Sequence, residues 1–376
     1  MTAPLLVSNR LPAQFSCDAD GTLTVEPSNG GLATGLAGPW KRTGARWIGH
    51  AEIEPRPPLP WSAEVMARLE EERLVPVELD EEVMQGYYGG ISNGLLWPVF
   101  HDRIDQIAFE PGDWEDYVSA NAAFAETILK EMRDDQVVWV HDYHLCLVPE
   151  LVRAHRPEAR IGFFLHVPFP SRDAFTAIPW RAELLRGILG ADYVAFHTPG
   201  YLANFLEACR HLGIANANID GVVVGQRQVG LGVLPLGIDA GVWAEESEQR
   251  LPETAALLGD VDGERLLLGV DRLDYSKGVP RRLQSVDALL ERRPDLVGKI
   301  RFLQVGAPSR EDVAAYSTYR RSVQELVGSI NGKWANGSWV PIHNIERVLS
   351  RSQIIPLYRA ADVMVVTPLR DGLNLV

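Results

Sequence analysis

The sequence predicts an α/β protein made of two doubly wound domains. Short, continuously apolar runs such as LLVSN, QVVWVH, RIGFFLHV and DYVAFH alternate with longer amphipathic stretches. Continuous apolar runs are typical of parallel strands buried on both faces, and their alternation with helices favours a Rossmann-like sheet. The alternation begins again with RLLLGV, RFLQVG and DVMVVTP after a polar, turn-rich stretch. We therefore expect two Rossmann-like domains in one chain.

The helices and the domain boundary follow from the same pattern. The run GVVVGQRQVGLGVLPLGID predicts a hairpin and a last strand, and the turn-rich stretch after it places the boundary near residue 250. The domains are then residues 1–250 and 251–376. Only about three strands follow before the chain stops at DGLNLV, so the second domain looks truncated.

Helices are expected over residues 115–134, 145–155, 174–189, 201–212, 279–293 and 310–328.

Composition excludes several classes of protein. The 376 residues carry 36 basic and 50 acidic side chains, and this net charge of −14 argues against nucleic acid or an anionic membrane as the principal partner. No apolar run approaches the roughly 18–20 residues of a membrane span, and the start MTAPLLVSNR lacks the pattern of a signal peptide. We expect a cytoplasmic protein. The three cysteines lack the spacing of a zinc site or a disulfide framework. The sequence does not decide whether the protein forms a homo-oligomer.

Candidate functional residues of the first half lie just after expected strands. Gly30 and Gly31 in NGGLATGLAGPW precede a helix and suit a phosphate bound to backbone N–H groups, although a plain turn fits as well. Asp142 follows VVWVH. Its carboxylate could hold a sugar hydroxyl, act as a base, or cap the N-terminus of the helix that follows. His166 stands in HVPFP, a turn that two prolines make rigid.

Two cations of the second half bracket the turn after RLLLGV. Arg272 and Lys277 in DRLDYSKG stand at the head of an expected helix. Two cationic donors beside a helix N-terminus suit a diphosphate. The alternative is that both cations form salt bridges with Asp271 and Asp274.

Other polar and aromatic residues also lie near expected strand ends. Arg310 follows the strand RFLQVG, and Asp371 follows the last strand. Tyr87, Tyr88 and Trp97 form an aromatic group that fits either a sugar subsite or the core.

Four motifs appear in a fixed order: VSNR with NGGL, YYGGISNGLLWPVFH, VHDYHL with FFLHVPFP, and VDRLDYSKG with TPLRDGLNLV. Together they resemble the retaining glycosyltransferases of the trehalose-6-phosphate synthase family, over the span from about residue 5 to residue 376. The resemblance implies a GT-B fold, in which two Rossmann-like domains face each other and hold ligands in the cleft between them. It implies transfer of glucose from UDP-glucose to a sugar phosphate, glucose 6-phosphate, to give trehalose 6-phosphate and UDP. It implies neither a metal nor a cofactor.

The resemblance assigns the acceptor side one residue at a time. Arg10 of VSNR, Tyr88 and Trp97 of YYGGISNGLLW, and Arg310 would hold glucose 6-phosphate, with the two arginines taking its phosphate. A planar guanidinium fork suits a phosphate dianion better than an ammonium group does. Asp142 of HDYH would orient the acceptor sugar, and we expect it to bind rather than to act as a nucleophile.

The donor side is assigned in the same way. His166 would contact the donor glucose near its reacting carbon, and Arg272 and Lys277 would clamp the diphosphate. Their fixed charges would replace the metal that other sugar transferases use to stabilise the leaving group. The implied catalytic set is His166, Arg272, Lys277 and Asp142. The further donor contacts implied are Gly30, Gly31, Asp371, Gly372, Leu373, Asn374, Leu375 and Val376.

The implied reaction has no covalent intermediate, because no side chain stands out as a nucleophile. By resemblance, the acceptor hydroxyl attacks on the face that UDP leaves and gives its proton to a departing phosphate oxygen. Retention of configuration then depends on how the two substrates are positioned.

Two departures from the family pattern leave alternatives open. His50 in WIGH stands where the family usually has a tryptophan that shapes the acceptor pocket, so glycerol 3-phosphate is an alternative acceptor. The chain stops before the family's ribose-binding glutamate and closing helices, so a non-catalytic module that binds sugar phosphates is a further alternative. The sequence does not fix the nucleotide of the donor. A nicotinamide-dependent enzyme is disfavoured because the chain lacks G-x-G-x-x-G in NGGLATGLAGPW.

Overall fold

The protein divides into two compact units. The computed structural model describes residues 2–17, 23–27, 31–51, 53–54, 63–214, 216–218, 221–249, 263–309, 314–372 and 374–376. The first unit comprises residues 1–238 and 372–375, and the second comprises residues 239–371 and 376. The division falls after Ile238 rather than near residue 250, because helix α10 (Ala240–Gln249) packs on helix α14 (Arg351–Ala360) of the second unit.

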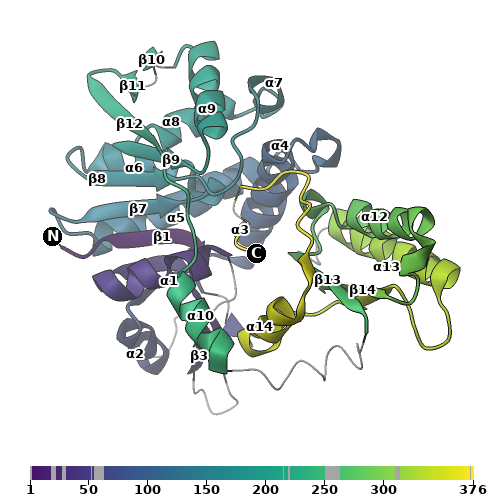
Figure 1. Ribbon diagram of the computed structural model, residues 1–376. Helices are drawn as coiled ribbons and strands as arrows, with labels where there is room; N and C mark the ends of the chain where they lie inside the picture. Colours follow the sequence, from purple (N-terminus) through teal and green to yellow (C-terminus); the bar gives the residue numbers. More distant parts are fainter. Residues whose placement is uncertain are drawn as a thin grey trace. The chain divides into compact units, whose positions relative to one another are not determined.

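A nine-stranded sheet forms the centre of the first unit, and Figure 1 shows its strands as one layer with helices packed against it. The strand order is β10-β11-β12-β9-β8-β7-β1-β4-β6. Strands from β12 to β6 pair in parallel, and β10, β11 and β12 form an antiparallel extension. The strands are β1 (Leu5–Arg10), β4 (Arg46–His50), β6 (Leu74–Val77), β7 (Val137–His141), β8 (Arg160–Phe164), β9 (Tyr193–Phe196), β10 (Asn216–Asn218), β11 (Gly221–Val224) and β12 (Arg227–Val233).

Helices and a second small sheet complete the first unit. The small sheet has the order β3-β2-β5, with β2 (Ala13–Cys17), β3 (Leu23–Pro27) and β5 (Ile53–Glu54). The helices are α1 (Gly31–Thr43), α2 (Ala63–Glu71), α3 (Glu81–Met84), the π-helix η1 (Gln85–Leu96), α4 (Trp97–Phe100), η2 (Ile104–Gln106), α5 (Asp113–Glu131), η3 (Tyr143–Leu145), α6 (Val148–His155), α7 (Arg172–Phe175), α8 (Arg181–Ile188) and α9 (Pro199–His211).

The second unit is built on a four-stranded parallel sheet with the order β15-β14-β13-β16. Its strands are β13 (Arg265–Arg272), β14 (Ile300–Ala307), β15 (Ile342–Ile345) and β16 (Val363–Met364). Its helices are α10, η4 (Tyr275–Lys277), α12 (Val279–Arg292), η5 (Pro294–Leu296), α13 (Ala314–Trp334) and α14.

Both faces of this smaller sheet are covered, as expected for buried parallel strands. Successive side chains of β13 point to opposite faces. Leu267 packs in the cluster that holds the apolar residues of α12 and α13, whereas Leu266 and Leu268 pack in the cluster that holds those of α14. Figure 1 shows α12 and α13 side by side next to β13 and β14.

In each unit the strand order reverses between two neighbouring strands. In the first unit the chain adds β4 and β6 on one side of β1, and β7, β8 and β9 on the other. In the second unit it adds β14 and β15 on one side of β13, and β16 on the other. Such a reversal leaves a crevice at the carboxyl ends of the two strands, where open α/β sheets bind ligands. The ends of β1, β7, β13 and β16 are therefore the places to look for a site.

The expected elements are largely present, with differences that have local causes. The expected helix 174–189 is split into α7 and α8 around Pro179, whose ring disfavours helical backbone in the residue before it. DVMVVTP gives only the two-residue strand β16. Within the described residues, no helix combines the length and the apolar character that crossing a membrane requires.

Candidate active site

The site in the first unit is built at the ends of β1, β7 and β8. Arg10 is the last residue of β1, Asp142 directly follows β7, and His166 lies two residues beyond β8. Because β7 pairs with both β1 and β8, these three residues lie on neighbouring parallel strands at the same edge of the sheet. The strand order reverses between β1 and β7, so Arg10 and Asp142 lie at the strand ends where open α/β sheets bind ligands.

Asp142 links two of these strand ends through hydrogen bonds. Its carboxylate Oδ1 accepts a hydrogen bond from the backbone N–H of His166 (3.1 Å), and its own N–H donates to the carbonyl of Phe164 (2.8 Å). Its backbone has φ 76°, a left-handed value that is costly for a residue with a Cβ and that clusters at functional sites. Asp142 occupies the N-cap position of η3, but its side chain makes no capping hydrogen bond there. The predicted N-cap position is therefore confirmed, but the carboxylate bonds to His166 instead of capping η3.

His166 lies in a buried group of histidines. Its Nε2 is 3.0 Å from Nδ1 of His141, the last residue of β7, and its ring stacks on Phe164 at 4.4 Å between centroids. The ring of His197, which follows β9, lies 5.5 Å away. Burial lowers the pKa of His141 to about 3, and burial together with the neighbouring His141 and His197 lowers the pKa of His166 well below its usual range. Both rings are therefore neutral at physiological pH.

Arg10 belongs to a stack of three side chains. Its guanidinium carbon lies 4.7 Å from the ring centroid of Tyr88, and the Tyr88 ring stacks on His144 at 5.8 Å with an interplanar angle of 10°. Tyr88 comes from η1, a π-helix of 12 residues. π-Helical segments are rare in proteins, and many of those that occur lie at functional sites. The stack holds a planar cation at the exposed end of β1, where it suits a phosphate.

The other two aromatic residues of the predicted sugar subsite belong to the core. Tyr87 is fully buried, and its hydroxyl donates a hydrogen bond to Oδ1 of Asn9 (2.8 Å). Burial raises the pKa of this phenol well above its usual range. Trp97 is 6% exposed and packs against His101 at 4.0 Å and Tyr143 at 5.9 Å between ring centroids. Of the three, Tyr88 is the one that keeps a partly exposed ring beside Arg10.

The site in the second unit lies at the end of β13. Arg272 is exposed, and its Nη1 donates a hydrogen bond to Oγ of Ser309 (3.3 Å). Lys277 ends η4 and is almost fully buried, where its ammonium group forms an ion pair with Asp371 from the segment after β16. This ion pair joins the ends of β13 and β16, the two strands between which the order reverses.

A second, deeper ion pair supports this end of β13. The carboxylate of Asp271 lies 2.6 Å from Nη2 of Arg282 on α12, and both side chains are buried. Arg282 also donates to Oγ1 of Thr367 (2.9 Å) and to Oε1 of Gln304 (3.2 Å). Gly269 makes room for this guanidinium, because a Cβ there would lie 2.8 Å from Nη1. Burial raises the pKa of Asp271, and the charge of Arg282 opposes that rise.

The turn that carries Lys277 is held by hydrogen bonds of Asp274, one within the turn and one to α13. Oδ1 of Asp274 accepts the N–H of Ser276 (2.9 Å), and its Oδ2 accepts the hydroxyl of Tyr316 (3.2 Å). Gly278 then has φ 65°, and a Cβ there would lie 2.7 Å from the carbonyl oxygen of Thr367. Glycine is favoured at this position because the backbone is left-handed and the neighbouring chain is close.

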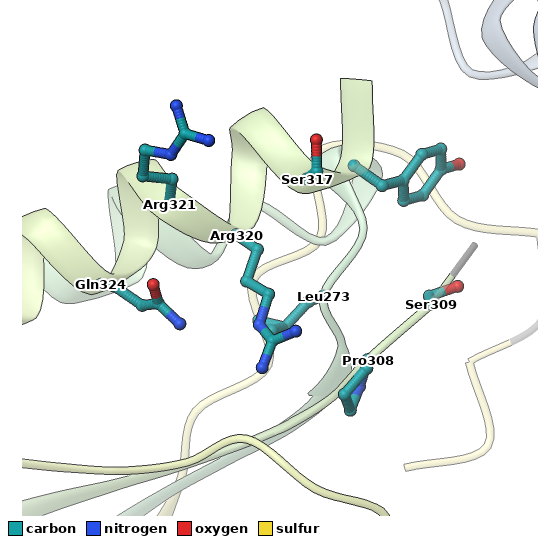
Figure 2. A pocket seen from close by; sticks show the side chains of 8 residues that line it. Leu273, Pro308, Ser309, Ser317, Arg320, Arg321 and Gln324 are labelled. Atoms are coloured by element: carbon teal, nitrogen blue, oxygen red, sulfur yellow. The ribbon is translucent and has the colours of Figure 1, made fainter. Parts of the chain in front are cut away.

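A pocket of about 280 Å³ opens beside Ser309 in the second unit. Figure 2 shows Arg320 and Gln324 extending from α13 toward Pro308. Nε of Arg320 and Nε2 of Gln324 both donate to Glu346, at 2.8 and 2.7 Å. Because Ser309 is also the partner of Arg272, the pocket borders the cation that was predicted to hold a diphosphate. It is lined by Leu273, Pro308, Ser309, Tyr316, Ser317, Arg320, Arg321 and Gln324.

Most of the remaining predicted residues lie in the first unit or outside the described part of the chain. Gly31 is the first residue of α1, and Gly372 lies so close to the HVPFP turn that a Cβ would be 2.2 Å from the carbonyl oxygen of His166. Asn374 and Leu375 follow in the same unit, and Val376 is grouped with the second. Gly30, Arg310 and Leu373 lie outside the residues that the structure describes.

Comparison with known proteins matches residues 2–376 to the model of glycosyltransferase family 20. A relative from Aspergillus fumigatus named alpha,alpha-trehalose-phosphate synthase (UDP-forming) 2 is 41% identical over 381 residues, which cover 99% of this chain and 79% of the relative. The chain belongs to glycosyltransferase family 20.

Solved structures of similar proteins share the fold of this family 20 glycosyltransferase over nearly the whole chain. A structure described as trehalose-6-phosphate from E. coli bound with UDP-2-fluoro glucose is 32% identical, with a TM-score of 0.84, and the match covers 99% of this chain and 80% of that one. An alpha,alpha-trehalose-phosphate synthase (UDP-forming) from Burkholderia xenovorans in complex with glucose-6-phosphate is 31% identical, with a TM-score of 0.84 and coverage of 99% and 81%. These matches confirm the GT-B class of fold expected from the sequence.

Two buried residues of this family 20 glycosyltransferase were not singled out from the sequence. Arg282 shares a helix face with Val279 and Leu283, so its helical position could have identified it as buried. His141 stands beside Asp142 in the HDYH motif, but only the pairing of β7 with β8 brings it to His166. Within the described part of the chain, no group of three His, Cys, Asp or Glu side chains has the arrangement of a metal site.

Proposed function

We propose that this protein is a retaining glucosyltransferase that moves glucose from UDP-glucose to glucose 6-phosphate, giving trehalose 6-phosphate and UDP. The observation that carries the proposal is the likeness to the UDP-forming synthase of Aspergillus fumigatus, which is 41% identical over 99% of the chain. The Escherichia coli structure with UDP-2-fluoro glucose and the Burkholderia xenovorans structure with glucose-6-phosphate support the donor and the acceptor.

The second unit binds the nucleotide diphosphate in this proposal. Arg272 is exposed at the end of β13 and offers a planar fork of N–H donors. Lys277 has three N–H donors, so its ammonium can bond Asp371 and still reach a phosphate oxygen. Asp371 and Val376 of this unit are further donor contacts in the proposal, and residues 372–375, Gly30 and Gly31, which are numbered in the first unit, complete the proposed donor set.

The first unit binds the acceptor and the transferred sugar. Arg10, held by its contact with Tyr88, takes the phosphate of glucose 6-phosphate. Arg310, from the span 239–371, is a further phosphate contact in this proposal. Asp142 orients the acceptor sugar, and His166 contacts the donor glucose. Trp97 shapes this side from within the core, because its ring is almost fully covered by His101 and Tyr143.

The reaction follows from where charge develops. Breaking the bond between the anomeric carbon and the phosphate oxygen leaves the electron pair on UDP and an oxocarbenium-like sugar. The guanidinium of Arg272 and the ammonium of Lys277 stabilise the charge on UDP without rearrangement, because both are already held in place. The acceptor hydroxyl then bonds to the anomeric carbon on the same face and gives its proton to the departing phosphate oxygen. Asp142 acts as a binding group, since one of its carboxylate oxygens already accepts the N–H of His166.

The experiment measures UDP release by the purified protein from UDP-glucose, with glucose 6-phosphate or glycerol 3-phosphate as the acceptor. We expect release that depends on glucose 6-phosphate, a product with the α,α linkage by NMR, and full activity in EDTA. GDP-glucose and ADP-glucose serve as donor controls. Release with glycerol 3-phosphate alone would replace the acceptor. Binding of glucose 6-phosphate with no release from any donor would favour the non-catalytic module.

A further inference from the structure

A single proton lies in the hydrogen bond between His141 and His166. Nδ1 of His141 and Nε2 of His166 are 3.0 Å apart and buried, so one nitrogen donates a hydrogen bond and the other accepts it. Each ring is neutral, because burial lowers the pKa of both. A neutral imidazole carries a single N–H, so the direction of this hydrogen bond fixes the proton position on both rings.

The two possible directions leave different atoms unsatisfied. Nε2 of His141 and Nδ1 of His166 are buried, and neither has a hydrogen-bond partner among the described residues. If His166 donates, the proton of His141 sits on Nε2 as a buried N–H with no acceptor. If His141 donates, its Nε2 is a bare acceptor, and the proton of His166 sits on Nδ1. In the protein alone, each direction therefore leaves one buried N–H without an acceptor in the described part of the chain. A ligand oxygen that accepts from Nδ1 of His166 removes this orphan only in the second direction. The second direction is then favoured, because orphaned buried N–H groups are rarer in proteins than under-satisfied acceptors.

Neighbouring residues hold both rings in this orientation. His141 ends β7, and its ring packs against Trp139 at 4.6 Å between centroids. The backbone N–H of His166 is fixed by Asp142, and the ring of His166 stacks on Phe164. Neither ring can move far without losing these contacts.

We propose that His141 is a positioning residue that holds His166 in the tautomer with its proton on Nδ1, so that Nδ1 donates a hydrogen bond to an acceptor oxygen of the donor hexose. This inference rests on the proposed function, in which His166 contacts the donor sugar. His141 itself touches no substrate and acts only through the orientation and the proton position of His166.

The direct test is an NMR measurement on the whole protein with its nine histidines labelled with ¹⁵N. His141→Asn and His166→Asn variants assign the signals of the two rings by their disappearance. With UDP-glucose bound, we expect His166 to be protonated at Nδ1 and bare at Nε2, and His141 to be protonated at Nδ1. A proton on Nε2 of His166 in that complex would overturn the inference.

A matched pair of variants tests the role in turnover. Asparagine and leucine have similar shapes and both remove the ring of His141, but only the amide nitrogen of asparagine can donate near the position of Nδ1. We expect kcat/KM for UDP-glucose to be roughly three- to tenfold lower in His141→Leu than in His141→Asn, which is the range for losing one hydrogen bond. KM for the acceptor should be unchanged. Equal activity of the two variants would show that His141 only fills space.

A panel of UDP-sugars that each lack one hydroxyl separates positioning from general damage. For the sugar that lacks the oxygen contacted by His166, the difference between the leucine and asparagine variants should vanish, while it persists for the others. A uniform loss with every donor would contradict the proposal. If the wild-type protein releases no UDP with any acceptor, the proposed function fails, and the NMR result on the ligand-free protein still decides the direction of the hydrogen bond.

Discussion

Two histidines at the ends of β7 and β8 are withdrawn from water, and each must lose any extra proton in the folded state. His141 has a folded pKa of about 3, against 6.5 for the ordinary side chain, because burial penalises its charged form. Between these two values the unfolded chain binds a proton that the folded chain does not. The free energy of unfolding therefore falls as the pH drops from about 6.5 toward about 3.

This sign gives a prediction for acid stability. His141 alone should lower the free energy of unfolding by up to about 1.4 kcal/mol for each pH unit below its unfolded pKa. His141→Asn should flatten the pH dependence measured by urea unfolding between pH 6.5 and pH 4.5, even though the variant is less stable overall. The control variant is His155→Asn, which removes an exposed histidine of α6 instead of a buried one. Equal slopes for wild type and His141→Asn would contradict the assignment.

Single residues at strand ends were predictable, because an apolar run marks a buried strand and the polar residue after it marks the edge. The pattern correctly predicts that Asp142, His166, Arg272 and Lys277 lie at or just beyond strand ends, whereas their roles stay predictions. The partners of these residues were not predictable. The ion pair of Lys277 with Asp371 spans 94 positions of sequence and depends on β16 lying beside β13.

At the scale of elements, one arginine ties three parts of the second unit together. Arg282 reaches from α12 to Asp271 at the end of β13, to Gln304 in β14 and to Thr367 after β16. The neighbouring Arg281 is exposed. A guanidinium with several donors can join these strand ends where an apolar side chain could only fill space.

Removing this guanidinium should destabilise the second unit strongly. Arg282→Met leaves the carboxylate of Asp271 buried without its cation, which we expect to cost about 3–5 kcal/mol in the free energy of unfolding. Arg281→Met is the matched control and should change stability by less than about 0.5 kcal/mol. The double variant Arg282→Met with Asp271→Asn should recover part of the loss, because no uncompensated charge remains. Chemical unfolding measures all three, and a similar cost for both single variants would refute the role of the network.

Elements differed in how well their sequences predicted them. The helix α12 was predictable, because its apolar residues recur with the helical period. It was expected over residues 279–293, and it spans Val279–Arg292. The π-helix η1 was not expected, because the glycines of QGYYGGISNGLL indicate turns and no simple pattern marks a π-helix. Its course depends on packing against α5, where a Cβ on Gly86 would lie 2.1 Å from the carboxylate of Asp116.

For the whole molecule, the sequence predicted two Rossmann-like units because the strand and helix pattern starts twice. The place of the division was harder to predict. The segment 239–249 has the polar composition of a linker, yet it forms α10 and packs on α14, with Arg359 donating to the carbonyl of Ser247 (2.7 Å). The return of residues 372–375 to the first unit could not be read from composition, because it depends on the close approach of Gly372 to His166.

The proposed division of labour between the units can be tested by ligand-induced stabilisation of the whole chain. A ligand at 100 times its Kd stabilises the state that binds it by about 2.7 kcal/mol, so UDP and glucose 6-phosphate should each raise the temperature of thermal unfolding. Arg272→Ala should remove most of the shift caused by UDP and leave the shift caused by glucose 6-phosphate. Arg10→Ala should do the reverse, because its guanidinium lies in the first unit beside Tyr88. The two variants serve as controls for each other. If both lose both shifts equally, the assignment of the diphosphate to Arg272 and of the sugar phosphate to Arg10 is wrong.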